Sequence, residues 1–305
     1  MQFKRIGKED KELIESFTKP WGIENADYSF TTLYLWGRHG KITYAVEDDA
    51  LFLLYRFPEN IPFFSCPVTK DKNADYGKLV DKAFSMLKEM GVENPCLRTV
   101  TPPFRELIEK SRPEMIFTRT RNADDYVYTA QSLSTLAGKK LHAKRNHINR
   151  FLQENENWEY VPMSSSMLYE CMELYDEWQE HKDEEYVEEL EEFDEKLTVE
   201  LAVKRMDEFG LTGGAIRIDG VLQAFCVAER ITEDMMLVHI EKANADINGL
   251  YPMINREFVR HECADVSWVN REDDMGLDGL RKAKLSYYPE RMIEKYAASY
   301  GKIEE

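Results

Sequence analysis

Three strand-like runs joined by two tight turns constrain the fold of this chain more than any other feature of its sequence. The runs are residues 213–218, 222–231 and 235–240. Asp219-Gly220 joins the first two, and Asp-Gly between apolar runs is the strongest short-range hairpin signal. The second connection, residues 232–234, is equally short. The sequence therefore predicts an antiparallel meander.

The segments around this meander have helical and strand-like patterns in a definite order. Two amphipathic helices are predicted before it, at residues 167–179 and 194–209. A helix at 250–263, a strand at 266–269 and a last helix from 277 to about 287, stopped by Pro289, follow it. This order resembles that of the acetyltransferase (GNAT) fold.

The first half of the chain also predicts alternating strands and helices. Helices are expected at 8–17, 76–90 and 103–110, a hairpin at 42–54, and strands at 96–100 and 125–129. A long helix at 133–155 is predicted to bridge the two halves. We therefore expect an α/β protein of layered α+β type with two domains, residues 1–131 and residues 132–305, the second including the bridging helix.

Charge is distributed unevenly along the chain. The 57 acidic and 40 basic residues give a net charge of −17, which argues against DNA and against non-specific attachment to anionic lipid. Residues 180–195 include ten acidic side chains and are expected to form a solvated helix end or loop. By contrast, residues 138–150 contain five basic side chains and no acidic one. A local basic site on an acidic protein is therefore predicted.

Membrane segments, disulfides and metal sites are not indicated by the sequence. No run approaches the ~18 uncharged apolar residues that a membrane span needs, so we expect no integral membrane association and a cytoplasmic location. The five cysteines are scattered, without a C-x-x-C pair or neighbouring histidines, which predicts neither structural zinc nor a disulfide framework. Cys226 and Cys263 lie in apolar segments and are expected to be buried thiols.

Three segments carry a family resemblance: residues 138–151, 237–243 and 270–289. They resemble a bacterial family (DUF2156) related to the C-terminal catalytic domain of phosphatidylglycerol lysyltransferases. The resemblance implies two tandem GNAT-like domains, each a mixed, mostly antiparallel sheet flanked by helices. It also implies a likeness to Fem-type enzymes, which move an amino acid from aminoacyl-tRNA to an amine or hydroxyl. The chain departs from lipid-modifying members in lacking a multi-span membrane domain and in its strong acidity.

Two side chains at the end of the third meander strand are the candidate catalytic residues. His239 and Glu241 are two positions apart, so regular strand alternation would project both to one face. Glu241 could then act as a base or orient His239. The alternative interpretation is a structural histidine that is hydrogen-bonded within the sheet.

The candidate donor-binding residues share positive charge, an aromatic ring or a position in a loop. They are His142, Lys144, Arg145 and Asn146 on the bridging helix, Asn270, Arg271 and Glu272 after the last strand, and Lys282, Lys284, Tyr287 and Tyr288 on the final helix, to which Arg281 and Lys295 add charge. They are predicted to form one pocket for a phosphate-bearing donor. The alternatives are solvated basic helix faces and a loop closed by local ion pairs.

Gly249 is the remaining candidate, at the start of the helix after the meander. Ordinary acetyl-CoA enzymes bind pyrophosphate there through a glycine-rich R/Q-x-x-G-x-G/A turn, but residues 246–251 contain Gly249 alone. The sequence therefore favours an acyltransferase that moves an aminoacyl group. Its donor would be an aminoacyl-tRNA or an acyl-CoA, and no other cofactor is assigned. The alternatives are a non-catalytic binding module for a small anionic metabolite and an acetyl-CoA-dependent N-acetyltransferase.

Overall fold

The computed structural model describes residues 1–38, 41–57, 61–180 and 195–301. It contains two compact units. The first comprises Met1–Asp125, Asp273–Gly276 and Met292–Glu305, and the second comprises Tyr126–Glu272 and Leu277–Arg291. Residues 181–194, most of the acidic run, lie outside the described residues.

The division of the chain differs from the two-domain prediction in two respects. The first unit ends at Asp125 and not at residue 131, and the C-terminal segment belongs to the first unit. The reason is strand pairing: β15 (Tyr296–Ser299) is hydrogen-bonded between β6 (Leu97–Val100) and β7 (Ile116–Arg119). A sequence pattern does not reveal that the C-terminal strand pairs with strands of the first unit.

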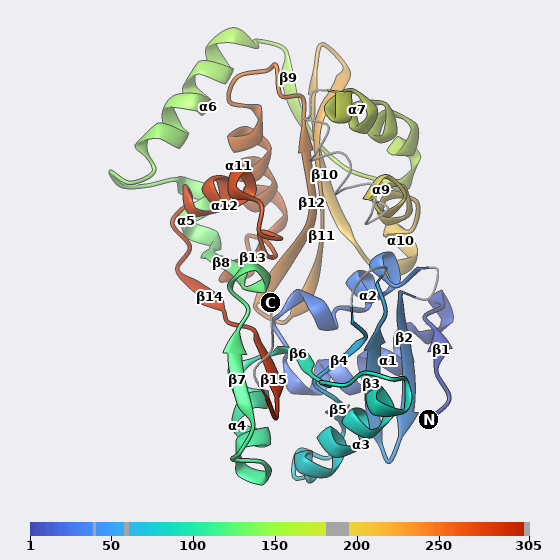
Figure 1. Ribbon diagram of the computed structural model, residues 1–305. Helices are drawn as coiled ribbons and strands as arrows, with labels where there is room; N and C mark the ends of the chain where they lie inside the picture. Colours follow the sequence, from blue (N-terminus) through green and yellow to red (C-terminus); the bar gives the residue numbers. More distant parts are fainter. Residues whose placement is uncertain (39–40, 58–60, 181–194, 302–305) are drawn as a thin grey trace. The chain divides into compact units, whose positions relative to one another are not determined.

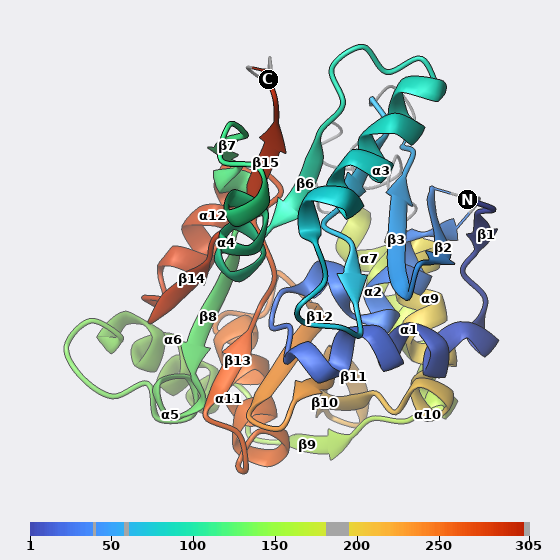
Figure 2. The same cartoon turned by 90° about the horizontal axis from the view of Figure 1, so that it is seen from below.

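The first unit has one sheet, with the strand order β1-β2-β3-β4-β6-β15-β7 and with β5 paired to β3 among the described residues (Figure 2). Its other strands are β1 (Lys4–Arg5), β2 (Ile42–Glu47), β3 (Ala50–Tyr55), β4 (Phe63–Ser65) and β5 (Val68–Thr69). The predicted hairpin at 42–54 is confirmed as β2–β3. Asp48 and Asp49 form its two-residue turn, with positive φ of 53° and 55°, a backbone region that aspartate tolerates better than most residues.

The three helices predicted for the first unit are confirmed as α1 (Lys11–Thr18), α3 (Tyr76–Glu89) and α4 (Pro102–Ser111). The structure adds α2 (Phe30–Trp36). Helix α3 begins where the Asp75 carboxylate accepts hydrogen bonds from the amides of Gly77 and Lys78, and it buries Leu79 and Leu87. The sequence did not predict α2 or the strands β1, β4, β5, β7 and β15.

The second unit is built on a seven-stranded sheet with the order β14-β8-β13-β12-β11-β10-β9 within the described part of the chain (Figure 1). Its strands are β8 (Asp125–Thr129), β9 (Trp158–Pro162), β10 (Thr212–Ile218), β11 (Val221–Thr232), β12 (Met235–Ala243), β13 (Trp268–Asn270) and β14 (Arg291–Ile293). Strands β10, β11 and β12 pair antiparallel, which confirms the predicted meander. Asp219 and Gly220 form the first turn, both with positive φ.

Helices lie on both faces of this second sheet (Figure 1). One face carries α5 (Ala130–Thr135), α6 (His142–Glu154), α11 (Leu250–Glu262) and α12 (Asp278–Leu285). The other carries α7 (Leu168–Glu180), α9 (Glu195–Lys204) and α10 (Met206–Phe209).

The predicted bridging helix at 133–155 is wrong as a single helix. Helix α5 ends at Thr135, and α6 begins only at His142. Leu136 and Gly138 between them have left-handed backbones, with φ of 50° and 85°. The guanidinium of Arg145 donates hydrogen bonds to the carbonyls of both residues and so satisfies backbone groups that a continuous helix would have paired.

The burial predicted for Cys226 and Cys263 is confirmed. All five cysteines are buried and free. None of the helices in the described ranges combines the length and apolar character that crossing a bilayer requires. Nor do the described His, Cys, Asp and Glu side chains form a group suited to holding a metal ion.

The sequence predicted that Lys295 lies on the final helix, but that helix ends at Leu285. Lys295 follows β14 and belongs to the first unit, and its side chain is 1% exposed. Its ammonium contacts the carboxylates of Asp125 at 2.7 Å and Asp27 at 2.5 Å. A buried cation between two carboxylates holds the C-terminal segment to this unit.

Replacing Lys295 with methionine should lower the free energy of unfolding by about 3–5 kcal/mol, because it removes the cation that compensates the buried carboxylates. Urea denaturation measures this change. Lys196→Met is the matched control, since the Lys196–Asp176 pair is more than half exposed on both sides. It should cost about 0–1 kcal/mol. Equal losses in the two variants would contradict the structural role of Lys295.

Candidate functional site

The candidate site of the second unit lies where two neighbouring strands separate. Strands β12 and β13 run parallel and pair from Met235 and Trp268 to Leu237 and Asn270. Strand β13 ends there, whereas β12 continues to Ala243. Beyond this point the two chain segments are no longer paired with each other. Side chains of β12 after Leu237 and of the segment after Asn270 can therefore face the same space.

A buried ion pair occupies this position. Arg271 Nη2 donates to Glu241 Oε1 at 2.9 Å, and each side chain is only 11% exposed. The second carboxylate oxygen, Glu241 Oε2, accepts from Asn255 Nδ2 of α11 at 3.0 Å. Burial lowers the pKa of Arg271, but the Glu241 carboxylate and two tyrosines outweigh burial, so the pKa is raised and the guanidinium stays charged.

Two tyrosine rings lie against the guanidinium of Arg271. Its central carbon is 5.0 Å from the ring centroid of Tyr287 and 5.8 Å from that of Tyr128. Both rings are buried, and they contact each other edge to face. Such rings stabilise a cation without offering it a hydrogen-bond acceptor.

Two polar atoms of this cluster have no hydrogen-bond partner among the described residues. They are Arg271 Nη1, a donor, and Asn255 Oδ1, an acceptor. Asn255 is 2% exposed, so its side chain is as buried as the apolar core. Because buried polar atoms are nearly always paired, Arg271 Nη1 calls for an acceptor and Asn255 Oδ1 for a donor, which a water or a ligand can supply.

Lys144 of α6 brings a second cation to the same ring. Its ammonium is 4.0 Å from the ring centroid of Tyr287, which lies just after α12. Within the described part of the chain, no carboxylate forms an ion pair with Lys144. Burial and the charge of Arg271 lower its pKa to about 8, against a smaller raising effect of Glu241. Lys144 therefore exchanges its proton much nearer neutral pH than an ordinary lysine does.

Lys284 of α12 fixes the backbone beside Arg271. Its ammonium donates to the carbonyl of Arg271 at 2.6 Å, and the hydroxyl of Tyr128 donates to the carbonyl of Lys284 at 2.7 Å. The structure thus brings together Lys144, Glu241, Arg271, Lys284 and Tyr287 of the sequence-predicted set.

His239 and Glu241 do not share a face of the sheet, contrary to the prediction. The register shifts at this point: Val227 pairs with Ile240, but the next residue, Ala228, pairs with Val238. His239 is therefore an extra residue in a β-bulge.

The contacts of the two side chains fit this shift. Glu241 is opposite Cys226 of β11, whereas His239 is bonded to Glu229, three positions further along β11. Positions three apart on a strand point to opposite faces. The bulge therefore separates the two predicted catalytic residues.

The other predicted residues have separate surroundings. His142 is exposed and lies 3.2 Å from the Asn146 amide, and Arg145 is bound to the carbonyls before α6. Asn270 is buried and accepts from the Glu272 amide at 2.7 Å. Lys282 is exposed on α12.

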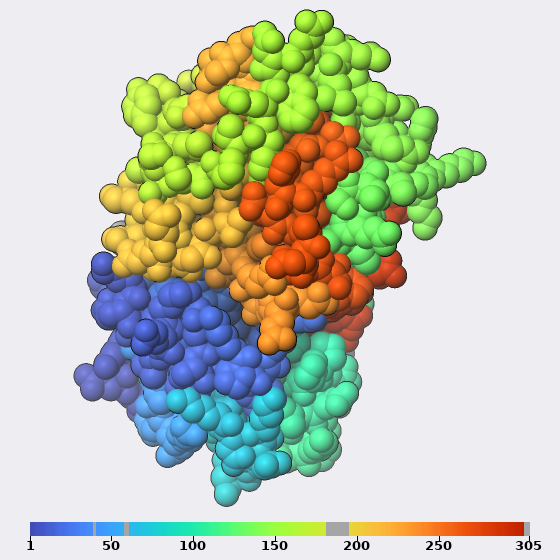
Figure 3. All heavy atoms as spheres, turned by 180° about the vertical axis from the view of Figure 1, so that it is seen from behind, coloured from blue at the N-terminus to red at the C-terminus, as the bar shows by residue number. Residues whose placement is uncertain are grey.

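The ring of Tyr288 is 49% exposed, and its centroid lies 5.4 Å from the ammonium of Lys140. Lys140 belongs to the segment between α5 and α6. This segment projects from the surface of the second unit, as the protruding green spheres in Figure 3 show. Lys139 and Lys140 are both exposed there.

Gly249 has a packing role in this structure. Its φ is +81°, and a Cβ built on it would lie 2.1 Å from the carbonyl oxygen of His147 on α6. The ring nitrogen His147 Nδ1 is also 3.2 Å from Asn248 Oδ1. The turn that begins α11 is therefore in close contact with α6.

Asn255 and Tyr128 were not identified from the sequence. Asn255 lies among the buried residues Leu250, Ile254 and Phe258 of α11, and an amide on an apolar helix face is a detectable signal. Tyr128 offers no comparable signal, because a buried tyrosine in a strand is ordinary.

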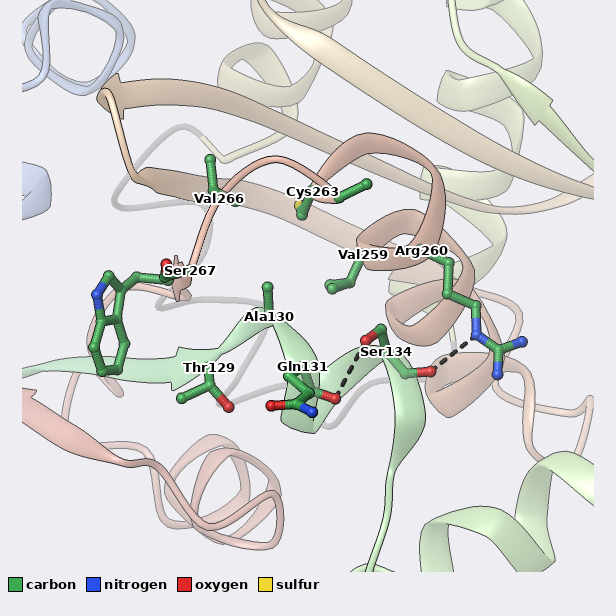
Figure 4. A pocket seen from close by; sticks show the side chains of 11 residues that line it. Thr129, Ala130, Gln131, Ser134, Val259, Arg260, Cys263, Val266 and Ser267 are labelled. Carbon is green, nitrogen blue, oxygen red and sulfur yellow. Dashed lines mark hydrogen bonds between the residues drawn. The ribbon is translucent and has the colours of Figure 1, made fainter.

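A hollow of about 570 Å³ lies elsewhere in the second unit (Figure 4). It is lined by the start of α5, the C-terminal end of α11 and the segment before β13. Arg260, on its rim, donates to the carbonyl of Ser134 at 2.9 Å. None of the sequence-predicted site residues is among the described residues that line it.

Glu241→Gln should lower the pKa of Lys144 below its value of about 8, and Arg271→Gln should raise it, because the carboxylate favours the ammonium and the guanidinium opposes it. Nuclear magnetic resonance titration of the lysine side chain measures both changes. The lowered pKa also means that folding becomes more favourable as the pH rises from about 8 towards the ordinary value of 10.5.

Glu154→Gln on the same helix is the control for this titration. Its carboxylate is 46% exposed and paired with Arg150, so the pKa of Lys144 should not change. A pKa of Lys144 that is unaffected by either site substitution would contradict the described geometry.

Comparisons with known proteins place this architecture. The family model of the C-terminal domain of phosphatidylglycerol lysyltransferase matches residues 21–299. A conserved protein of unknown function from Bacteroides thetaiotaomicron has a crystal structure with a TM-score of 0.88, at 35% identity over 98% of this chain and 99% of that chain.

More distant matches agree on the fold. The domain (DUF2156) described as the C-terminal part of a lysylphosphatidylglycerol synthetase from Agrobacterium fabrum has a TM-score of 0.65 at 13% identity, covering 97% of this chain and 93% of that chain. A tandem GNAT protein from the clavulanic acid biosynthesis pathway has a TM-score of 0.50 at 10% identity, with 99% of both chains covered.

Among curated proteins, an uncharacterised protein of Mycoplasmoides gallisepticum is 25% identical over 177 residues, which is 57% of this chain and 56% of that protein. The match thus spans about half the length of this relative. The family model covers most of the chain, and the fold is that of tandem GNAT proteins. The chain therefore belongs to the family of the phosphatidylglycerol lysyltransferase C-terminal domain.

Proposed function

We propose that the second unit is an acyltransferase that moves an aminoacyl group from a charged tRNA to an amine or hydroxyl acceptor. The family and the fold support an acyltransferase-like function. The observation that carries the finer proposal is the pair of buried atoms without partners, Arg271 Nη1 and Asn255 Oδ1. An aminoacyl ester presents a carbonyl oxygen that accepts and an α-ammonium group that donates, which matches one donor and one acceptor on two residues that both bind Glu241.

Transfer requires a base, stabilisation of the oxyanion and an oriented donor. The acceptor attacks the ester carbonyl, the carbon–oxygen bond to the ribose breaks, and the acceptor proton passes through a base to the departing ribose oxygen. We assign oxyanion stabilisation to Arg271, whose guanidinium is already charged, oriented and largely removed from water.

Lys144 is the base that this geometry favours. Glu241 was the candidate from the sequence, but both its oxygens already accept hydrogen bonds, from Arg271 and from Asn255. Glu241 is therefore assigned the orientation of Arg271. Lys144 forms no ion pair with a described carboxylate, and its pKa of about 8 suits proton transfer near neutral pH.

A basic and aromatic surface near α6 supports a tRNA donor. Lys139, Lys140 and Lys282 are exposed, and Lys140 lies over the exposed ring of Tyr288. Cations bind phosphates, and an exposed ring can stack on an unpaired base at the tRNA end. On a chain with a net charge of −17, a local surface of this kind is suited to one oriented polyanion.

The turn before α11 argues against acetyl-CoA as the donor. Its backbone amides would have to hold the pyrophosphate, but α6 packs on the turn at Gly249 and Asn248. This close packing disfavours the conventional N-acetyltransferase that the sequence left open.

The test is transfer of a labelled aminoacyl group from a mixture of charged tRNAs, with labelled acyl-CoAs in parallel. Arg271→Gln and Lys144→Met should each reduce transfer by at least about 100-fold, as the loss of an oxyanion donor or of a positioned base does. Lys196→Met, on the exposed surface, should transfer at the wild-type rate.

Each of the other results would overturn the proposal. Turnover with an acyl-CoA and none with charged tRNA would establish a different donor. Binding without turnover, unchanged in Glu241→Gln, would establish the non-catalytic binding module. A folded protein that neither binds nor transfers any of these donors would exclude both.

A further inference from the structure

A second cluster of charges lies on the opposite face of the sheet from Glu241. His239 Nδ1 is 2.9 Å from Glu272 Oε1, and His239 Nε2 is 3.1 Å from Glu229 Oε1. The histidine side chain is 4% exposed. A carboxylate only accepts hydrogen bonds, so both ring nitrogens must carry a proton to satisfy this arrangement.

His239 is therefore an imidazolium. Burial lowers its pKa, but the hydrogen bonds and charges of Glu229 and Glu272 outweigh burial and raise the pKa to about 10. Such a ring has no lone pair with which to accept a proton at neutral pH. This geometry leaves His239 no capacity for general-base catalysis and gives it a fixed charge instead.

Glu272 links this imidazolium to the candidate site, because it directly follows Arg271. Its backbone has a left-handed φ of 56°, which a glutamate adopts only when other interactions hold it. The Tyr126 amide donates to the Glu272 carbonyl at 3.0 Å, and the Arg271 amide donates to the Tyr126 carbonyl at 2.9 Å. The Glu272 side chain has its ion pair with His239.

We propose that His239 is a positioning residue that acts through Glu272 to hold the guanidinium of Arg271 beside Glu241. The Arg271 side chain reaches Glu241, whereas the side chain of the next residue, Glu272, reaches His239 on the opposite face of the sheet. An anchor on Glu272 therefore sets the direction of Arg271. The inference deepens the proposed function, because Arg271 is the oxyanion-stabilising residue there. It requires no contact between His239 and the substrate.

The test compares the same substitution on the two sides of the imidazolium. Glu272→Ala removes the link to Arg271, whereas the control Glu229→Ala removes the other partner of His239 and leaves that link. His239→Gln is the third variant. Urea denaturation checks that each variant is folded, and Glu272, at 23% exposed, is the more tolerant position if His239→Gln fails to fold.

The first readout is the nuclear magnetic resonance signal of the Arg271 guanidinium. In the wild type, the bond to Glu241 should keep the two Nη signals separate. They should merge in Glu272→Ala and in His239→Gln and stay separate in Glu229→Ala, because only the first two variants release Arg271. A general structural weakening would instead affect Glu229→Ala as much as Glu272→Ala.

The second readout is binding of inorganic phosphate as an anionic probe. We expect its dissociation constant to rise about tenfold in Glu272→Ala and His239→Gln and to change little in Glu229→Ala. Separate Nη signals in folded His239→Gln or Glu272→Ala would overturn the proposal. Merged signals in those variants, with no phosphate binding by the wild type, would support the positioning role and count against the proposed donor site, so the two failures are distinguishable.

Discussion

The ion pair between Arg271 and Glu241 is the interaction on which the rest of the candidate site depends. Removing a guanidinium from water is costly unless a carboxylate compensates it at close range. Glu241 does so at 2.9 Å, and the second carboxylate oxygen is held by Asn255. Because the pair is formed within the protein, the unpartnered Nη1 of Arg271 is directed and charged before any ligand arrives. Preorganised charge of this kind is what acyl transfer requires.

A single extra residue in β12 arranges the charges of the second unit into two clusters with different properties. On one face, Arg271 and Asn255 each retain an unpartnered atom, and Lys144 is a cation with a lowered pKa. On the other, His239 has both ring nitrogens satisfied by carboxylates. An unpaired buried polar atom is free to take a partner from outside the protein, whereas a fully satisfied network makes its surroundings rigid.

The packing of α6 gives this unit features that the general fold does not require. It brings Lys144 to the Tyr287 ring and covers the turn at Gly249. The same helix thus supplies a titratable amine to the site and occupies the surface where an acetyl-CoA enzyme would bind pyrophosphate. Helix α6 begins at His142, after the left-handed residues that separate it from α5.

Local sequence determined the elements whose signals are local. Asp219-Gly220 set the first turn of the meander, and Asp75 and the apolar positions of α3 set that helix. The segments that contain Arg271, Lys144 and Tyr287 could be named from their charge, their rings and their family resemblance. In physical terms, turn chemistry and periodicity act over a few residues and can be read directly.

Only the tertiary structure decided which of those residues meet. The bulge at His239 depends on the register between β12 and β11. Strand alternation alone therefore wrongly placed His239 on the same face as Glu241. Asn255 became a site residue, and Lys295 was buried with Asp125 and Asp27, through contacts between segments far apart in the chain. Such contacts depend on burial and on strand pairing between distant segments, and the residues nearby in the sequence do not encode them.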